Sequence, residues 1–201
     1  MGIVIGVVLF ACIALLAIEL SKAVCARVEP LDGAPPTSQP PVVVLTAAAA
    51  FVGAALVARG VAPMQFVIFG VLTFALVASW ASDSLRGIVP DVFTLVPLGI
   101  VLLLAIVQRD WIVFVSAVLL FVPFAVAAWT TKGRGMGWGD VKLVTLAAAA
   151  LGAPLAMAAM IVACLAAVVG YRVKRIAGGP IAFAPYIAAA VGVAIPLGLG
   201  R

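Results

Sequence analysis

Long, continuous apolar runs are the feature that most constrains the fold of this chain. Of its 201 residues, 67% are hydrophobic and only 9% are charged, whereas soluble domains contain about 25% charged residues. A helix that crosses a hydrocarbon core of about 30 Å needs about 20 mostly apolar residues. The composition therefore excludes a soluble globular domain and leaves room for seven or eight membrane spans with short connections.

The apolar runs predict an all-α bundle of transmembrane helices that forms a single domain over residues 1–201. The segment Gly152–Pro154 predicts a tight turn between the sixth and seventh runs. The sixth run is short for a full span, so we expect either a half-depth helix or a merger with its neighbour, which would leave seven spans. The eight runs are Ile3–Leu20, Val42–Val57, Met64–Ala81, Val92–Val107, Ile112–Trp129, Val141–Leu151, Leu155–Val169 and Ile181–Leu199.

The distribution of basic residues predicts the orientation of the bundle. Cytoplasmic loops of membrane proteins carry an excess of Lys and Arg. A Pro-rich loop (27–41) and a Gly-rich loop (131–139) would both be cytoplasmic if the N-terminus lies outside. Nine basic residues then fall inside and three outside. The inside set is Lys22, Arg27, Arg86, Lys132, Arg134, Lys142, Arg172, Lys174 and Arg175, and the outside set is Arg59, Arg109 and Arg201. The net charge of +5 follows from this bias, so no nucleic-acid partner is expected.

The composition also excludes several catalytic chemistries. The chain has no His, which rules out Ser-His-Asp triads, Cys-His pairs and HExxH zinc sites. Its three cysteines, Cys12, Cys25 and Cys164, are scattered and form no CxxC motif. We therefore expect neither a metal site nor a cofactor.

Only seven acidic residues are present, and most have simple interpretations. Glu29, Asp32 and Asp110 are expected to be solvated loop charges, and Glu19 is expected to snorkel or to pair with Lys22. The remaining three acidic residues, Asp83, Asp91 and Asp140, lie at the edges of apolar runs and need a different interpretation.

Asp83 ends the third run and Asp140 opens the sixth, so both fall at the cytoplasmic edge of the hydrocarbon region. Ionisable groups at membrane depth are costly and usually face a bundle interior or a water-filled cavity. Two carboxylates that meet there would share one proton, and one could act as base and the other as acid on a single water. The alternative is a pair of helix-capping carboxylates that never touch, since Asp140 would make a good N-cap.

Local sequence around these acids resembles the motifs of type IV prepilin peptidases. The segment Gly135-Met-Gly-Trp-Gly-Asp140-Val-Lys-Leu143 is similar to the GMGxGDxKL motif of that family, whose GxGD core also occurs in presenilin-type intramembrane aspartic proteases. Asp83 is followed seven residues later by Pro90, then Asp91 and Thr94, which resembles the first aspartate segment of the family. A third, weaker similarity to a PFGPY-like segment covers 180–186, where Ala182 and Ala184 replace Pro and Gly. The resemblance extends from about Trp80 to the C-terminus.

The resemblance implies roles for individual residues. Asp83 and Asp140 would be the catalytic pair. Gly135, Gly137 and Gly139 would allow close backbone approach and positive φ near the site. Lys142 would contact a carboxylate or a lipid phosphate, or serve as a positive anchor on the inner side. We expect Pro90 near the first position of the fourth helix and Asp91 in its first turn. The residues expected to shape the site without performing chemistry are Gly135, Gly137, Gly139, Lys142, Pro90, Asp91, Thr94, Phe183 and Pro185.

The function implied by the resemblance is removal of a short basic leader from prepilin or pseudopilin precursors. Its setting would be the bacterial inner membrane, with the active site facing the cytoplasm, and its partners would be the precursors and membrane lipid. Many family members also N-methylate the product and carry a cysteine-rich insert with paired CxxC motifs. The corresponding loop, 27–41, contains no Cys, so methyltransferase activity is not expected.

Two other classes of function are compatible with membrane-embedded acids. One is a small transporter that binds protons or cations, although the acids lie near one face and no inverted repeat is visible. The other is a catalytically silent assembly factor, which the presence of both aspartates disfavours.

Overall fold

A computed structural model describes residues 1–27, 39–131, 136–175 and 183–197. Within these ranges the chain is all-α, which confirms the predicted fold class. Gly135, residues 28–38 of the Pro-rich loop and residues 180–182 lie outside the described residues. The eight helices are α1 (Gly2–Cys25), α2 (Val42–Ala58), α3 (Pro63–Arg86), α4 (Val92–Gln108), α5 (Trp111–Thr130), α6 (Trp138–Leu151), α7 (Ala153–Arg175) and α8 (Ala184–Leu197).

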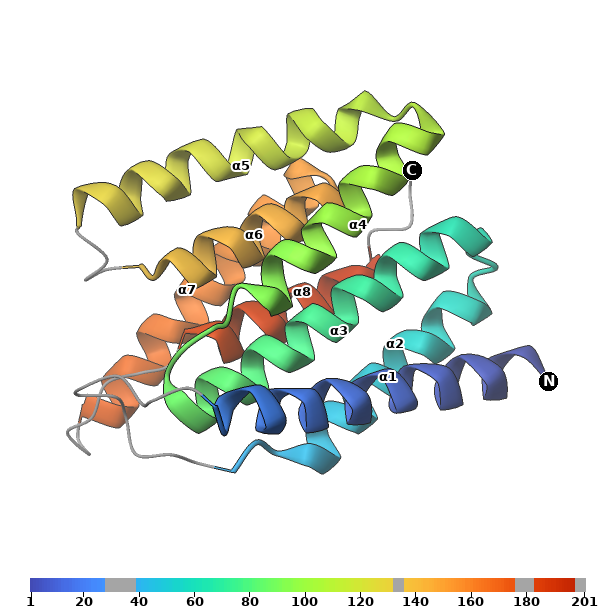
Figure 1. Ribbon diagram of the computed structural model, residues 1–201, viewed down its shortest axis with the longest axis horizontal. Helices are drawn as coiled ribbons and strands as arrows, with labels where there is room; N and C mark the ends of the chain where they lie inside the picture. Colours follow the sequence, from blue (N-terminus) through green and yellow to red (C-terminus); the bar gives the residue numbers. More distant parts are fainter. Residues whose placement is uncertain (28–38, 132–135, 176–182, 198–201) are drawn as a thin grey trace.

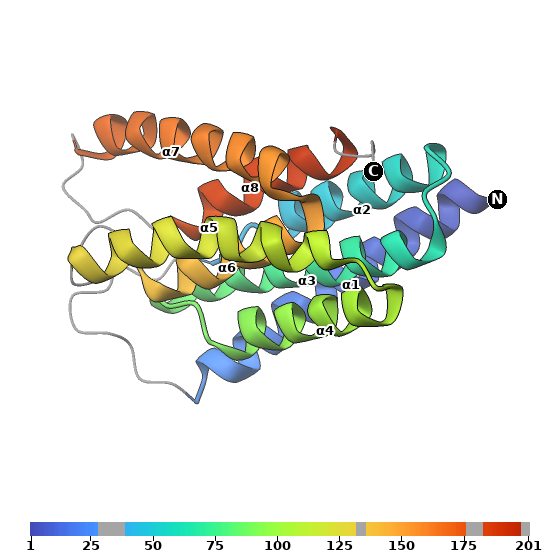
Figure 2. The same cartoon turned by 90° about the horizontal axis from the view of Figure 1, so that it is seen from above.

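Successive helices run in opposite directions through the bundle (Figure 1 and Figure 2). Helices α1, α3, α5 and α7 finish at the same end of the bundle at which α2, α4, α6 and α8 begin. We call this the site end. The N-terminus and the end of α8 lie at the opposite end (Figure 1). This alternation is the arrangement that the apolar runs predict for a multi-pass membrane protein.

The helices differ in length and therefore in how much of a membrane they can cross. Within the described parts of the chain, four are long and apolar enough for a span, namely Gly2–Cys25, Pro63–Arg86, Trp111–Thr130 and Ala153–Gly170. Helices α2 and α4 have 17 residues each and α8 has 14. Helix α6 has 14 residues, about 21 Å at 1.5 Å per residue. It is a separate short helix, so the merger with its neighbour that would leave seven spans does not occur.

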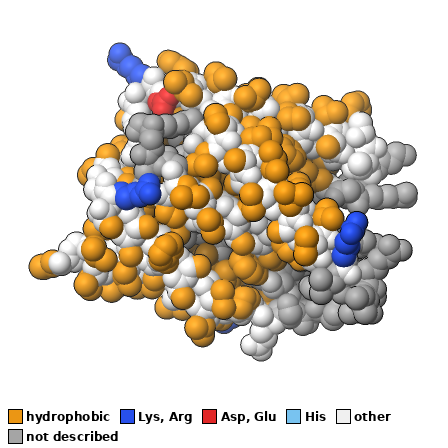
Figure 3. Space-filling view, turned by 180° about the vertical axis from the view of Figure 1, so that it is seen from behind, with side chains coloured by type: hydrophobic (Ala, Val, Ile, Leu, Met, Phe, Trp, Pro, Cys, Tyr) orange, Lys and Arg blue, Asp and Glu red, His pale blue; other side chains and the backbone are white. Residues whose placement is uncertain are grey.

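Helices α3 and α6 form the centre of the bundle. Helix α6 packs against α3, α4, α5, α7 and α8, and nine of its 14 residues are buried. Large hydrophobic side chains of the outer helices, such as Leu103 and Val169, are exposed. Figure 3 shows one face of the molecule covered by hydrophobic side chains, with its few charged side chains toward the ends. Asp83 and Asp140 thus belong to the two helices that the others enclose.

Glycines with positive φ produce two of the sharp helix ends. Gly87 adopts a left-handed conformation (φ 69°, ψ 20°) and ends α3. Gly152 (φ 85°) ends α6, and α7 begins at the next residue. The predicted turn at Gly152–Pro154 is confirmed, and Gly152 alone accomplishes the reversal, because glycine adopts positive φ without a Cβ clash.

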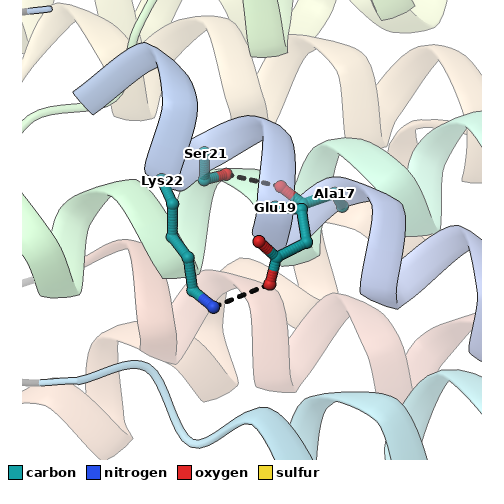
Figure 4. A network of polar contacts seen from close by, with 4 residues as sticks. All are labelled: Ala17, Glu19, Ser21 and Lys22. Carbon is teal, nitrogen blue, oxygen red and sulfur yellow. Dashed lines mark hydrogen bonds and ion pairs between the residues drawn. The ribbon is translucent and has the colours of Figure 1, made fainter. Parts of the chain in front are cut away.

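Helices α1 and α2 pack so closely that they exclude side chains at their crossing. A Cβ placed on Gly6 would lie 2.6 Å from the carbonyl oxygen of Gly53, so small residues permit this contact. Helix α1 also holds α3, because Ser21 Oγ donates to the carbonyl oxygens of Ala17 (2.7 Å) and Ala78 (3.1 Å). Nearby, Lys22 Nζ lies 2.7 Å from a Glu19 carboxylate oxygen (Figure 4), which confirms the predicted pairing.

Candidate active site

Asp83 occupies the last turn of α3 and is 7% exposed. Its Oδ2 accepts a hydrogen bond of 3.2 Å from the backbone N–H of Ala184. Ala184 is the first residue of α8, and N–H groups in the first turn of a helix have no partner within the helix. Asp83, from α3, therefore provides the acceptor that this N–H group lacks within α8.

Asp140 is the third residue of α6 and is half-buried. The N-cap of α6 is Gly137, so the sequence-based alternative in which Asp140 is the N-cap is wrong by three positions. The backbone N–H of Gly137 donates to the Asp140 carboxylate, and the charge of Asp83 acts on the same carboxylate. Each acid thus accepts a hydrogen bond from the N-terminal region of a helix, and the two carboxyls lie close enough to influence each other electrostatically.

A second carboxylate and a lysine connect α4 with α6 beside this pair. Lys142 Nζ lies 2.5 Å from Asp91 Oδ1, and the Asp91 side chain is 63% exposed. The sequence left three interpretations of Lys142: contact with a carboxylate, contact with a lipid phosphate, or a positive anchor. The structure shows a carboxylate contact, and the partner is Asp91. The expected positions in α4 are wrong by one or two residues: Asp91 is the N-cap, one residue before the first turn, and Pro90 lies two residues before the first helical position. The Lys142 pair draws the Asp91 side chain away from its own helix end, where it makes no capping hydrogen bond.

Gly139 of the Gly-rich motif acts by close approach and not by positive φ. A Cβ on Gly139 would lie 2.8 Å from the Cβ of Val89, in the segment that connects α3 to α4. Neither Gly137 nor Gly139 has positive φ, so the expectation of positive φ is wrong for both residues. Their backbones adopt ordinary conformations because α6 already begins at Trp138.

The other residues expected to shape the site occupy supporting positions. Thr94 is fully buried, and its Oγ1 donates to the Asp91 carbonyl oxygen at 3.3 Å. Phe183 precedes α8, and its carbonyl oxygen accepts from the N–H groups of Tyr186 and Ile187. Pro185 lies in the first turn of α8.

The direct contact with Asp83 comes from the backbone of Ala184, which the sequence did not single out. A backbone donor leaves no signal in residue type, and only its place between Phe183 and Pro185 could have indicated it. Among the described residues, no group of three or more His, Cys, Asp or Glu side chains could hold a metal ion.

These features define a multi-pass helical membrane protein with an acid on each of its two enclosed helices, both at the same end of the bundle. The sequence profile of the type IV leader peptidase family matches residues 70–172, about half of the chain, and the chain belongs to this family. The matched region contains both Asp83 and Asp140, while α1, α2 and α8 lie outside it. Comparison with curated proteins and with solved structures gives no match. Family membership identifies the protein as a peptidase.

Proposed function

We propose that the protein is an aspartic endopeptidase whose catalytic pair is Asp83 and Asp140. Its substrates would be prepilin or pseudopilin precursors, from which it removes a short basic leader. The observation that carries this proposal is that two carboxyls 57 positions apart in the sequence lie at the same end of the enclosed helices α3 and α6, with the charge of Asp83 acting on Asp140. Membership of the leader peptidase family supplies the substrate class.

The proposed reaction uses one water and forms no covalent enzyme intermediate. Two close carboxyls share one proton, because both cannot ionise easily. The ionised member takes a proton from the water as its oxygen attacks the scissile carbonyl carbon. The protonated member donates to the carbonyl oxygen, which gives a gem-diol. Collapse of the gem-diol breaks the C–N bond. The leaving amine takes the proton that the first carboxyl received from water, and a gem-diol hydroxyl returns its proton to the second carboxylate, which restores the starting pair.

The described charges support a cytoplasmic position of the site end. Cytoplasmic segments of membrane proteins are enriched in Lys and Arg. By the bounds of the helices, Lys22, Arg27, Arg86, Lys142 and Arg172 fall at the site end, and Arg59 and Arg109 fall at the opposite end. The precursor leader would accordingly be cleaved on the cytoplasmic side of a bacterial inner membrane.

We further propose that the protein cleaves without methylating its product. The cysteine-rich insert of the methylating family members has no counterpart in the sequence of residues 27–41. Cys12, Cys25 and Cys164 are all free thiols on helices, and two of them are exposed on the outer surface. Mass spectrometry of the processed product would show an unmodified N-terminus, whereas an N-methyl group added by the purified protein would contradict this.

Separate substitutions Asp83→Asn and Asp140→Asn test the catalytic pair. General acid–base catalysis contributes about 10²–10⁴-fold, so each variant should convert a pilin-like precursor at least about 100-fold more slowly in membranes. Glu19→Gln is the matched control, because Glu19 is an exposed acid toward the same end of the bundle. Immunoblots of precursor and product give the rates, and the amount of inserted protein is measured in parallel.

Normal processing by either aspartate variant would reject the pair. An altered ion flux with unchanged precursor conversion would instead favour the transporter alternative.

A further inference from the structure

An apolar groove opens on the side of the bundle between α2, α3 and α8. Its volume is about 600 Å³, and its walls are mainly aliphatic. We call it the α2/α8 groove and define it by Ala48 and Ala55 of α2, Thr73 and Trp80 of α3, and Ala188 and Gly192 of α8. Helix α2 packs mainly on α1 and makes little contact with α3. This leaves the groove open between α2 and α3, although the two helices are consecutive in the chain.

The groove leads toward Asp83 along two of its walls. On α3, Trp80 precedes Asp83 by three residues, which places both side chains on neighbouring positions of one helix face. On α8, Ala188 follows Ala184 by four residues, and Ala184 N–H is the donor to Asp83. One helical turn is about 5.4 Å. Two helices therefore place the site end of the groove about one turn from Asp83.

The lining suits close approach by another helix. Small residues at helix surfaces let backbones come together in membranes, and the groove presents Ala48, Ala55, Ala188 and Gly192. A Cβ on Gly192 would meet nothing within 4 Å.

The length and charge of the groove indicate which way such a helix would run. Its α2 wall extends from Val44 to Arg59, the C-cap of α2; these 16 residues span about 22 Å, which is most of a membrane span. Arg59 lies at the end away from the acids. A helix that begins at the site end points its C-terminus toward Arg59, and a cation near a helix C-terminus is favourable.

We propose that the α2/α8 groove receives the apolar helix that follows the scissile bond of the precursor. This inference rests on the proposed function. The helix would lie parallel to α8, with its N-terminus at the site end. The peptide just before the helix would then be extended past Asp83 and Asp140, where its carbonyl groups are free of helical hydrogen bonds.

Filling the groove tests the proposal by activity. Gly192→Leu places a large side chain in the groove, and Gly99→Leu places the same side chain on the exposed surface of α4, where a Cβ also meets nothing within 4 Å. Gly192→Leu should lower kcat/KM for the full precursor at least about 10-fold, mainly through KM. It should not change cleavage of a short peptide that contains the leader and junction but lacks the apolar helix. Gly99→Leu should leave both rates unchanged.

Photocrosslinking tests occupancy without requiring cleavage. A photoreactive residue at Val193, which lines the groove and is 64% exposed, should crosslink to the full precursor in vesicles. The same residue at Leu103 of α4, 61% exposed, should not. Wild-type precursor kinetics for Gly192→Leu would overturn the proposal, and so would crosslinks from Val193 only to lipid or to a second copy of the chain. If wild-type protein cleaves no precursor, the proposed function fails, and the crosslinks still decide whether the groove binds it.

Discussion

Gly139 and Gly137 stand two residues apart in the same motif, yet the structure predicts different tolerance to alanine. At Gly139 a Cβ would lie 2.8 Å from the Val89 Cβ, whereas at Gly137 it would lie 3.5 Å from Asp140 Oδ2, an ordinary contact. To reach about 3.4 Å, the start of α6 and the Val89 segment must separate by roughly 0.6 Å. Overpacking of this kind costs about 1–3 kcal/mol.

The displacement should affect activity more than folding. Asp140 directly follows Gly139, so a shift of the α6 N-terminus moves the carboxyl relative to Asp83. A misplacement of about 1 Å can cost about 100-fold in rate, so Gly139→Ala should reduce precursor conversion about 10- to 100-fold. Gly137→Ala should remain within about threefold, because it loses only part of a glycine N-cap preference worth a few tenths to about 1 kcal/mol.

Initial rates of precursor conversion in membranes measure both variants, with detergent unfolding as the stability readout. Val89→Gly removes the Cβ that the new methyl group meets, so the double variant Gly139→Ala/Val89→Gly should recover part of the lost activity relative to Val89→Gly alone. Equal activity of the two single alanine variants would refute the reasoning, and so would a failure of Val89→Gly to relieve the effect of Gly139→Ala.

Two further predictions concern contacts that support the site. A double-mutant cycle with Asp91→Asn and Lys142→Met should give a coupling of at most about 1 kcal/mol in unfolding free energy, because the pair is partly exposed; a coupling of several kcal/mol would contradict this. Ser21→Ala should lower the unfolding free energy by about 0.5–1.5 kcal/mol, because it removes the Oγ hydrogen bond from α1 to the Ala78 carbonyl of α3. The control Ser84→Ala, at a half-buried serine of α3, should have a smaller effect, and the reverse order would show that the bond contributes little.

Apolar run length was sufficient to predict the eight helices, because hydrocarbon exposure requires continuous apolar sequence and intrahelical hydrogen bonding. The ends were less predictable. Helix α1 continues to Cys25 and α7 to Arg175, past the last apolar residue of each run, since polar and basic side chains are stable in a helix that emerges from the membrane. Helix α6 begins at Trp138, before its apolar run, so Asp140 lies inside the first turn.

The pairing of helices could not be read from the runs. Nothing in the apolar pattern distinguishes the enclosed helices α3 and α6 from the outer ones, because lipid and protein interiors both accept aliphatic side chains. The acidic residues of α3 and α6 indicated that these helices are enclosed, because a carboxyl at membrane depth is tolerated where it faces the interior of the bundle. The Gly6–Gly53 crossing and the Ala184 N–H depend on backbone proximity between distant segments, and residue types alone do not specify it.

The position of the two acids at helix N-termini bears on how a dyad can be held in a membrane protein. Asp83 accepts from the first residue of α8, and Asp140 accepts from the N-cap region of α6. Each helix N-terminus carries a partial charge of about +0.5, whereas the C-terminal turn of α3 that holds Asp83 carries about −0.5, so the helix ends together offset only part of one negative charge. A pair of carboxyls that shares one proton, as we propose, carries one negative charge. The starts of α6 and α8 thus supply counter-charge from the backbone, which also opposes the effect of the α3 C-terminus on Asp83.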